Sequence, residues 1–178
     1  MIKKIVVIGP ESTGKSSLCE QLAKHFKTEW VREYAREYLV KHGTDYTYED
    51  LLKISAGQLK GEEDAIINIQ RSTSNTQLLF IDTDLYVMKV WSEFVFNKCD
   101  NLILTQIANR QYDLYLLCNT DVPWVKDELR EYPDLKTREK LFYFYKDAMI
   151  NQHVPWIEIA GDYDQRLKTA IEAVNKII

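Results

Sequence analysis

Residues close to the N-terminus form a pattern whose types and spacing suit the binding of phosphate. Gly9–Ser16 reads Gly-Pro-Glu-Ser-Thr-Gly-Lys-Ser and matches the Walker A pattern at every specified position. The glycines let the backbone wrap so that successive N–H groups point inward as a nest for an anion. Lys15 adds a mobile positive charge, and the Ser16 hydroxyl is a hard oxygen ligand that suits Mg²⁺. The pattern predicts a site for ATP with Mg²⁺, formed by Gly9, Glu11, Ser12, Thr13, Gly14, Lys15, Ser16 and Ser17.

The segments on either side of this loop are those that such a loop requires. An apolar, β-branched run over Lys3–Ile8 predicts a strand, and apolar residues at helical spacing after Gly14 predict a helix. This strand–loop–helix context disfavours the alternative of a chance match in a glycine-containing turn. The helix would also direct the positive end of its dipole at the phosphates.

Short apolar runs alternate with longer helical patterns along the rest of the chain. The alternation predicts an α/β fold of three layers, α/β/α, with a five-stranded parallel sheet in a single domain over residues 1–178. The other strands are expected at Thr28–Val31, Leu78–Asp82, Asp113–Cys118 and Trp156–Ile159. Helices are expected at Glu33–Lys41, from a Thr47 cap to about Gln70, at Asp84–Phe96, at Asn101–Gln111, from the end of a polar connection to about Asn151, and at Asp164–Ile177.

Acidic residues follow two of the expected strands, at the edge where parallel sheets bind their ligands. Asp82 ends an apolar strand in the Walker B arrangement, so we expect it to hold the metal together with Ser16; a helix N-cap is the alternative. Asp84 is the better candidate for that cap, although it can also face the site. Glu33 follows the second strand, where it could accept the proton of an acceptor hydroxyl or could be a surface acid in the first turn of a helix.

The polar stretch over residues 119–138 has the composition of a mobile lid, with two prolines and mixed charges. Arg130 within it could stabilise charge on a transferred phosphoryl group once the lid closes; a solvated charge run is the alternative. Trp124 could stack on an aromatic base. Trp91 lies in an apolar helical pattern, where packing in the core is the simpler interpretation.

The composition argues against several classes of partner. With 178 residues, a net charge of −4 and a pI of about 5.5, the chain is a poor candidate for binding nucleic acid or membranes non-specifically. No stretch approaches the length of a transmembrane helix. The three cysteines show no metal or redox spacing, which fits a reducing compartment. We therefore expect a cytoplasmic protein with small-molecule substrates, and the oligomeric state stays open.

Several segments in combination resemble one family over nearly the whole chain. The resemblance is to the ribosylnicotinamide kinase domain of NadR-type NAD-biosynthesis proteins. The Walker A segment is generic among nucleotide-binding proteins, whereas the other segments are much more specific as a set. The segments are Gly9–Ser16, Val31–Tyr38, Asp82–Asp84, Lys89–Phe94, Tyr112–Leu117 and Asp121–Arg130.

The resemblance implies a P-loop fold of the nucleoside- and nucleotide-kinase type with a helical lid. It implies that ATP and nicotinamide riboside react to give ADP and nicotinamide mononucleotide. It also implies that Glu33, Arg36, Asp82 and Asp84 lie on the acceptor side and that residues 124–130 belong to the lid. The pyridinium ring of that acceptor is positively charged, so acids and aromatic faces could hold it, and Trp91 and Trp124 are the candidates.

Two alternatives to this function stay open. The acceptor could be another nucleoside or a nucleoside monophosphate, or the chain could be a P-loop ATPase or switch module that acts on a protein partner. NadR-type proteins often carry an adenylyltransferase domain, and some add a DNA-binding helix-turn-helix. The chain lacks a His-x-Gly-His signature and is short, so we expect neither nucleotidyl transfer nor DNA binding.

Overall fold

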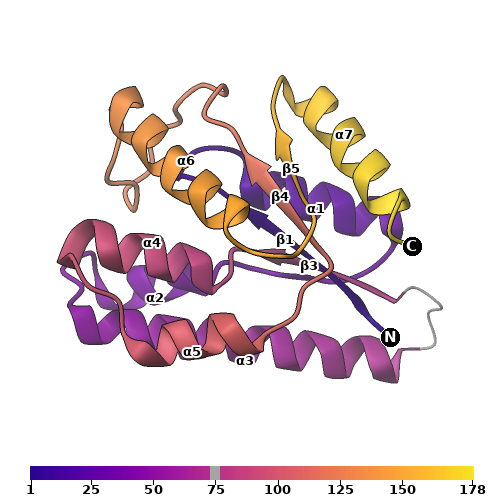
Figure 1. Ribbon diagram of the computed structural model, residues 1–178, viewed down its shortest axis with the longest axis horizontal. Helices are drawn as coiled ribbons and strands as arrows, with labels where there is room; N and C mark the ends of the chain where they lie inside the picture. The colour runs from indigo at the N-terminus through magenta and orange to yellow at the C-terminus, as the bar shows by residue number, and fades with distance from the viewer. Residues whose placement is uncertain (73–76) are drawn as a thin grey trace.

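The computed structural model describes residues 1–72 and 77–178 (Figure 1). The five strands are β1 (Lys3–Ile8), β2 (Trp30–Val31), β3 (Leu78–Asp82), β4 (Leu114–Cys118) and β5 (Trp156–Ile159). The helices are α1 (Lys15–Phe26), α2 (Tyr34–His42), α3 (Tyr48–Arg71), α4 (Leu85–Phe96), α5 (Asn101–Asn109), α6 (Leu135–Ile150) and α7 (Tyr163–Asn175).

The strands form one parallel sheet in the order β2-β3-β1-β4-β5. Strand β1 is central and pairs with β3 on one side, where Val7 lies opposite Asp82, and with β4 on the other. Because the strands run parallel, the loops that follow β1, β2 and β3 open at the same edge of the sheet. The expected five-stranded parallel sheet is confirmed, and this topology brings the phosphate loop beside the residue that ends β3.

Alternate side chains along the strands belong to two separate hydrophobic cores, one on each face of the sheet. Ile5 and Val7 of β1 pack with residues of α1 and α7 on one face, whereas Val6 and Ile8 pack with α3, α4 and α6 on the other. A strand directs successive side chains to opposite faces, so a sheet covered on both sides needs apolar residues at every position. Figure 1 shows the resulting three layers, with α1 and α7 together on one side of the sheet.

Capping residues define where several helices begin. The expected cap at Thr47 is confirmed as a capping box, in which Asp50 returns a hydrogen bond to the backbone of Thr47. Asp84 caps α4 by accepting from the Tyr86 N–H at 3.0 Å, as its position after β3 indicates. These two caps set the start of the two helices that flank the β3 edge of the site.

Two segments differ most from the expectation. Strand β2 is only Trp30–Val31, shorter than the expected Thr28–Val31, because only these two residues pair with β3. Residues 119–134 of the expected lid contain no helix, and only its last residues are helical, since α6 begins at Leu135 after an Asp134 cap. The two prolines of this segment remove backbone donors that a helix would need.

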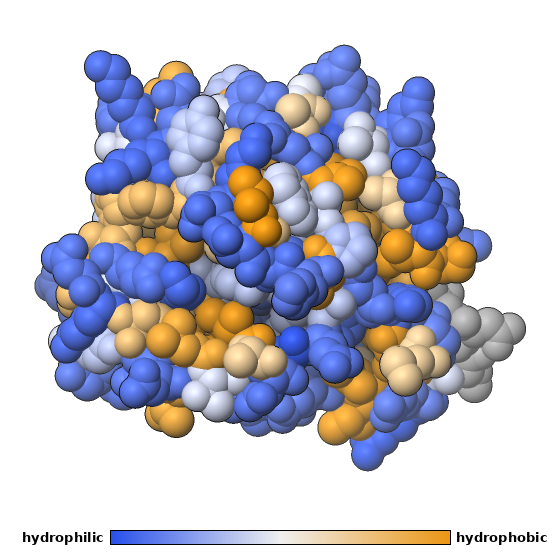
Figure 2. All heavy atoms as spheres, viewed as in Figure 1, coloured by the Kyte–Doolittle hydropathy of each residue, from blue (hydrophilic) through white to orange (hydrophobic). Residues whose placement is uncertain are grey.

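The outer surface is mainly hydrophilic on the face shown in Figure 2, where hydrophobic side chains lie in small patches between charged ones. Scattered hydrophobic residues of this kind are ordinary for a protein surface. Within residues 1–72 and 77–178, no helix is both long enough and apolar enough to cross a membrane.

Candidate active site

The loop between β1 and α1 has the backbone of a phosphate nest. Gly9 has φ of +139° and Gly14 has φ of +77°, values that side chains disfavour. A Cβ at Gly9 would also lie 2.6 Å from the carbonyl oxygen of Cys118 on β4. Only glycine at this position therefore lets the loop pass so close to the strand. Gly14 then serves as the N-cap of α1, which presents the amides of its first turn to the loop.

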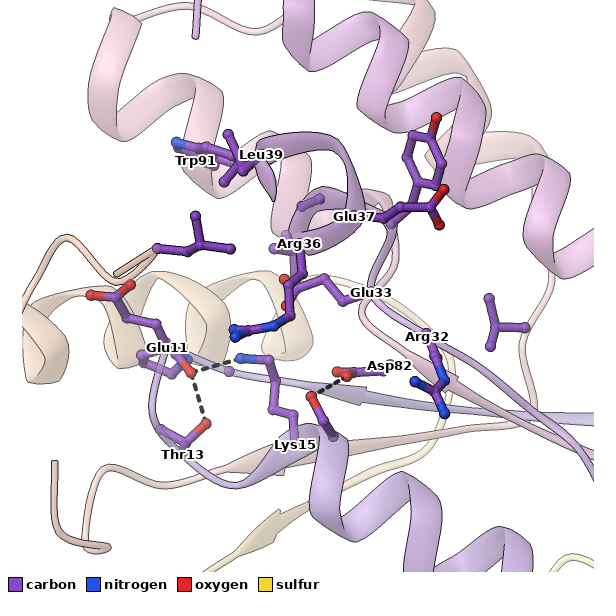
Figure 3. Close-up of a pocket in the computed structure, with 18 of the residues that line it drawn as sticks. Glu11, Thr13, Lys15, Arg32, Glu33, Arg36, Glu37, Leu39, Asp82 and Trp91 are labelled. Atoms are coloured by element: carbon purple, nitrogen blue, oxygen red, sulfur yellow. Dashed lines mark hydrogen bonds between the residues drawn. The ribbon is translucent and has the colours of Figure 1, made fainter. Parts of the chain in front are cut away.

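Two polar side chains of this loop, Thr13 and Lys15, turn back to one backbone oxygen of the loop (Figure 3). The Lys15 Nζ donates to the carbonyl oxygen of Pro10 at 2.8 Å, and the Thr13 hydroxyl donates to the same oxygen at 2.7 Å. Both residues are at least nine-tenths buried. A flexible lysine held in this way can exchange a backbone oxygen for phosphate oxygens with a small movement of its side chain.

The Ser16 hydroxyl donates to the Asp82 Oδ2 at 2.5 Å, which joins the start of α1 to the end of β3. The Asp82 Oδ1 is buried and has no hydrogen-bond partner among the described residues. A buried oxygen without a donor is costly unless a ligand satisfies it. The pair of a hydroxyl and a carboxylate therefore fits Mg²⁺, which binds through one or two protein oxygens together with phosphate oxygens and water.

The electrostatic surroundings of Asp82 agree with such a role. Burial and then the negative charge of Glu33 raise the pKa of this carboxyl to about 7, against the lowering effects of Lys15 and the Ser16 hydroxyl. A bound cation would favour the ionised form. Within the part of the chain that the structure describes, no group of three or more His, Cys, Asp or Glu side chains could hold a metal. Any Mg²⁺ here would thus depend on the nucleotide for further ligands.

Glu33 and Arg36 come from the turn after β2 and the first turn of α2, and both face the phosphate loop (Figure 3). Glu33 is the N-cap residue of α2, yet its side chain makes no capping hydrogen bond, so its carboxylate is not used to begin the helix. Arg36 donates to the Asp127 carboxylate at 2.8 Å. Figure 3 shows its guanidinium pointing into the cavity that Lys15 also lines, where two cations would attract an anion.

Side chains of the phosphate loop are bonded to the backbone of the segment 119–134. Ser12 accepts from the Val125 N–H at 3.0 Å, and Glu11 accepts from the N–H groups of Glu131, at 3.1 Å, and Tyr132. Burial raises the pKa of Glu11, and these two backbone donors lower it in part. Together with the ion pair from Arg36, these bonds hold the segment over the loop.

The site lies in a cavity of about 1050 Å³ that extends from the phosphate loop to a wall formed by α2, α4 and α6. This volume is at the upper end of the range of roughly 300–1,000 Å³ for small-molecule sites, so it has room for two substrates. The far wall is apolar and aromatic, with Leu39, Val90, Trp91, Phe94, Tyr132, Leu141 and Tyr145. Thirteen of the residues predicted from the sequence line the cavity: Gly9, Glu11, Ser12, Thr13, Gly14, Lys15, Ser16, Ser17, Glu33, Arg36, Asp82, Trp91 and Arg130.

Two predicted residues do not line this cavity. Asp84 is buried and accepts from the Tyr115 hydroxyl at 2.7 Å as well as capping α4; burial raises its pKa to about 6. Trp124 lies below the guanidinium groups of Arg130 and Arg138, whose central carbons are 5.8 and 5.2 Å from its ring. Their proposed contacts with substrate remain predictions.

Two of the predicted residues that line the cavity, Trp91 and Arg130, have defined hydrogen-bond partners. Trp91 is fixed by donating from its indole nitrogen to the Tyr46 hydroxyl at 2.8 Å, which leaves its ring on the wall. Arg130 lines the cavity and donates to the Val125 carbonyl oxygen, within its own segment. Arg130 therefore lies in the same cavity as the phosphate loop, while its one side-chain hydrogen bond among the described residues stays within its own segment.

Sequence reasoning missed two residues that support the site from behind. Arg166 of α7 is buried and donates to the Thr13 carbonyl oxygen at 2.8 Å and the Asn119 carbonyl oxygen at 2.9 Å, so it braces the phosphate loop. Gln58 of α3 is bonded to the backbone around the two acids. Neither belongs to a motif, and only their positions in apolar helical patterns, where a polar residue needs a partner, could have indicated them.

A family described as an AAA domain matches residues 4–166. The chain belongs to this family. The match includes the phosphate loop, both acid-bearing turns and α6, so these features of the site lie within the AAA domain.

Two curated relatives share this region of sequence. The trifunctional NAD biosynthesis/regulator proteins NadR of Escherichia coli (strain K12) and Salmonella typhimurium (strain LT2) are each 25% identical over 182 aligned residues. The alignment covers 99% of this chain but 43% of each relative, so the chain spans less than half of their length. The similarity to NadR-type proteins expected from the sequence is thereby confirmed.

Solved structures share the fold. A NadR protein in complex with NR superposes with a TM-score of 0.79 at 24% identity, covering 99% of this chain and 49% of the other. A NadR protein in complex with NAD and AMP-PNP superposes with a TM-score of 0.76 at 23% identity, with the same coverage of both chains. Deoxyadenosine kinase from M. mycoides with bound dATP gives 0.56 at 15% identity, covering 97% of this chain and 99% of the other. The P-loop kinase fold is confirmed.

Proposed function

We propose that this chain transfers the terminal phosphoryl group of MgATP to a hydroxyl group of nicotinamide riboside, giving ADP and nicotinamide mononucleotide. One observation carries the proposal: the phosphate loop, Asp82 and Glu33 meet at one edge of the sheet, in a cavity with an aromatic far wall. The relatives named for NAD biosynthesis and the shared fold with a complex that contains NR support this choice of acceptor.

The phosphate half of the cavity would hold the triphosphate through the amides of the loop and the Lys15 ammonium. Ser16 and Asp82 would hold Mg²⁺, which neutralises charge on the phosphates when bound. Phosphoryl transfer requires mainly positioning and charge neutralisation from a protein, and the inward-facing loop supplies both. Arg36, which also lines the cavity, would add a second cation on the side of the acceptor.

The acceptor half would place a hydroxyl group within reach of Glu33, which accepts its proton as the phosphoryl group arrives. The carboxylate of Glu33 is free of a capping bond and therefore available. The nicotinamide ring would lie against the aromatic wall near Trp91 and Tyr132. A positively charged ring is attracted by both the aromatic faces and the acids of the cavity. A neutral base can only pack against the aromatic faces.

A panel of acceptors tests the proposal directly. Purified protein with MgATP should release ADP faster when nicotinamide riboside is added, with kcat/KM at least about tenfold higher than for adenosine, deoxyadenosine or uridine. Preference for a neutral nucleoside or a nucleoside monophosphate would move the function to another kinase. ADP release that no acceptor stimulates would instead favour an ATPase or switch module with a protein partner.

A further inference from the structure

Gln58 of α3 lies between the two turns that carry the acids of the site. It is buried, with 3% of its surface exposed. Its side-chain nitrogen donates to the carbonyl oxygens of Thr83, at 3.0 Å, and Asp82, at 3.4 Å. Its side-chain oxygen accepts from the N–H of Tyr34 at 2.8 Å. One amide group thus joins the turn after β3 to the turn after β2.

Both turns expose backbone groups that regular structure leaves unsatisfied. Thr83 has φ of +70°, so the chain leaves β3 in a left-handed conformation and its carbonyl oxygen turns away from the sheet ladder. Tyr34 is the first residue of α2, and the first amides of a helix have no partner within it. The cap residue Glu33 does not satisfy these amides with its side chain. Gln58 supplies the missing partner on each side.

Each of these turns carries an acid of the site, since Glu33 precedes α2 and Asp82 ends β3. Both side chains line the cavity, so the spacing of the two turns sets the spacing of the two acids. A neutral amide that donates to one turn and accepts from the other can hold them without adding charge to the site.

Close packing beside Gln58 also holds α3 against the turn after β2. The preceding residue is Gly57, where a Cβ would overlap the ring of Tyr34, so this ring seats directly on the helix backbone. One turn further, Gly61 faces Val31 of β2, whose side chain would be 3.2 Å from a Cβ there. Helix α3 therefore fits closely against the β2–α2 turn, and Gln58 extends this contact to β3.

We propose that Gln58 is a positioning residue that fixes the spacing between Glu33 and Asp82 by bonding to the backbone of both acid-bearing turns. The inference rests on the proposed function, because it assigns these two acids to acceptor and metal. Gln58 itself contacts neither substrate. It is absent from the lining of the cavity and acts through Tyr34, Asp82 and Thr83.

The test compares Gln58→Met, which keeps the length of the side chain and removes its hydrogen bonds, with Gln58→Glu, which keeps an acceptor for the Tyr34 N–H. Gln70→Met makes the same change as the first variant on an exposed turn of the same helix and serves as control. For each protein we would measure thermal unfolding, kcat with nicotinamide riboside, and the affinity for ATP with Mg²⁺ and with EDTA.

We expect Gln58→Met to lower kcat by about ten- to a hundredfold, the size of effect that small misplacements produce, while Gln70→Met keeps wild-type values. The gain in ATP affinity that Mg²⁺ gives should shrink severalfold, because Asp82 is displaced. Gln58→Glu should lose less kcat, and should recover further as the pH falls, because a protonated carboxyl can donate to Thr83.

Wild-type kcat and an unchanged Mg²⁺ effect in a folded Gln58→Met variant would overturn the inference. So would equal losses in the Met and Glu variants at every pH, in step with lost thermal stability, because that pattern belongs to a purely structural residue. If the wild-type protein does not phosphorylate nicotinamide riboside, the proposed function fails, and the Mg²⁺ effect on ATP binding alone decides the status of Gln58.

Discussion

The ammonium group of Lys15 donates to the Pro10 carbonyl oxygen within its own loop, so its side chain is already aimed at the centre of the nest. We predict that Lys15→Ala lowers the rate of ADP formation by about 10²–10³-fold, since it deletes a charge that stabilises the transferring phosphoryl group. The fold should persist, because neighbouring Thr13 still bonds to the same oxygen. Steady-state kinetics and circular dichroism would measure both; a folded variant with normal turnover would remove Lys15 from the mechanism.

At Glu33 the relevant distinction is between binding and catalysis. Glu33→Gln keeps the size of the side chain and the start of α2 but removes the ability to take a proton. We predict that kcat falls by about 10²-fold or more while the dissociation constant of MgATP changes by less than about threefold. Unchanged kcat would transfer the role of base to another acid, with Asp82 next to consider.

Glu62 gives a residue-scale prediction about stability. It is fully buried, accepts from Arg110 and Tyr112 at 3.1 Å, and also faces the charges of Lys4 and Asp84. Burial raises its pKa to about 7, although Arg110, Tyr112 and Lys4 each lower it. Because the folded state binds this proton more tightly than the unfolded chain, the stabilisation is present at low pH and is lost as the pH rises through about 7.

Glu62→Gln removes that titration. We expect the free energy of unfolding of the variant, relative to wild type, to rise by about 1–3 kcal/mol between pH 5 and pH 8, because only the wild type must then bury a charge. Urea unfolding at the two pH values measures the difference. A difference that does not change with pH would show that Glu62 stays ionised throughout this range.

Helix α3 is the element on which the geometry of the acids depends most. A methyl group at Gly57 would overlap the ring of Tyr34 and push the β2–α2 turn away from the helix. We predict that Gly57→Ala lowers stability by about 1–3 kcal/mol, despite a better helix propensity, and lowers kcat as Glu33 moves. Gly61→Ala is the matched comparison, because its Cβ would meet Val31 at 3.2 Å and need a smaller shift. Equal behaviour of the two variants would contradict this account of Tyr34.

The sequence predicted the elements with local signals well. Strand β1, the phosphate loop and α1 carry their own pattern, and the caps at Thr47 and Asp84 were identified from residue type and position. The lid segment was harder to predict, because its conformation depends on bonds from Glu11 and Ser12 that are 113 to 121 residues away in the chain. Contacts at that separation leave no local pattern.

The same reason explains why the sequence did not indicate the residues that support the site. Gln58 and Arg166 bond to the backbone of segments far along the chain, and a backbone acceptor has no residue type that a sequence could reveal. Asp84 shows the opposite difficulty: its position beside Asp82 suggested the site, but the hydroxyl of Tyr115 on β4 turns it toward the core. Motifs thus predicted which loop residues line the cavity, and tertiary contacts determined which acids face it.

At the scale of the whole molecule, the strand order β2-β3-β1-β4-β5 explains why these residues meet. It places β3 beside β1, so that Asp82 lies one strand from the phosphate loop, and places β2 next, so that Glu33 is one strand further. The helices α2, α4 and α6 then close the far side of the cavity. Under the proposed function, a nucleotide would bind at the centre of the sheet and the acceptor toward the β2 edge.

The most direct measurement is phosphorus nuclear magnetic resonance of a reaction that contains the protein, MgATP and nicotinamide riboside. We predict that the resonance of the terminal phosphate of ATP declines while a phosphomonoester resonance, that of nicotinamide mononucleotide, grows in equal amount. If inorganic phosphate grew instead, or if ATP stayed intact in the presence of folded protein, the central claim of phosphoryl transfer to this acceptor would be contradicted.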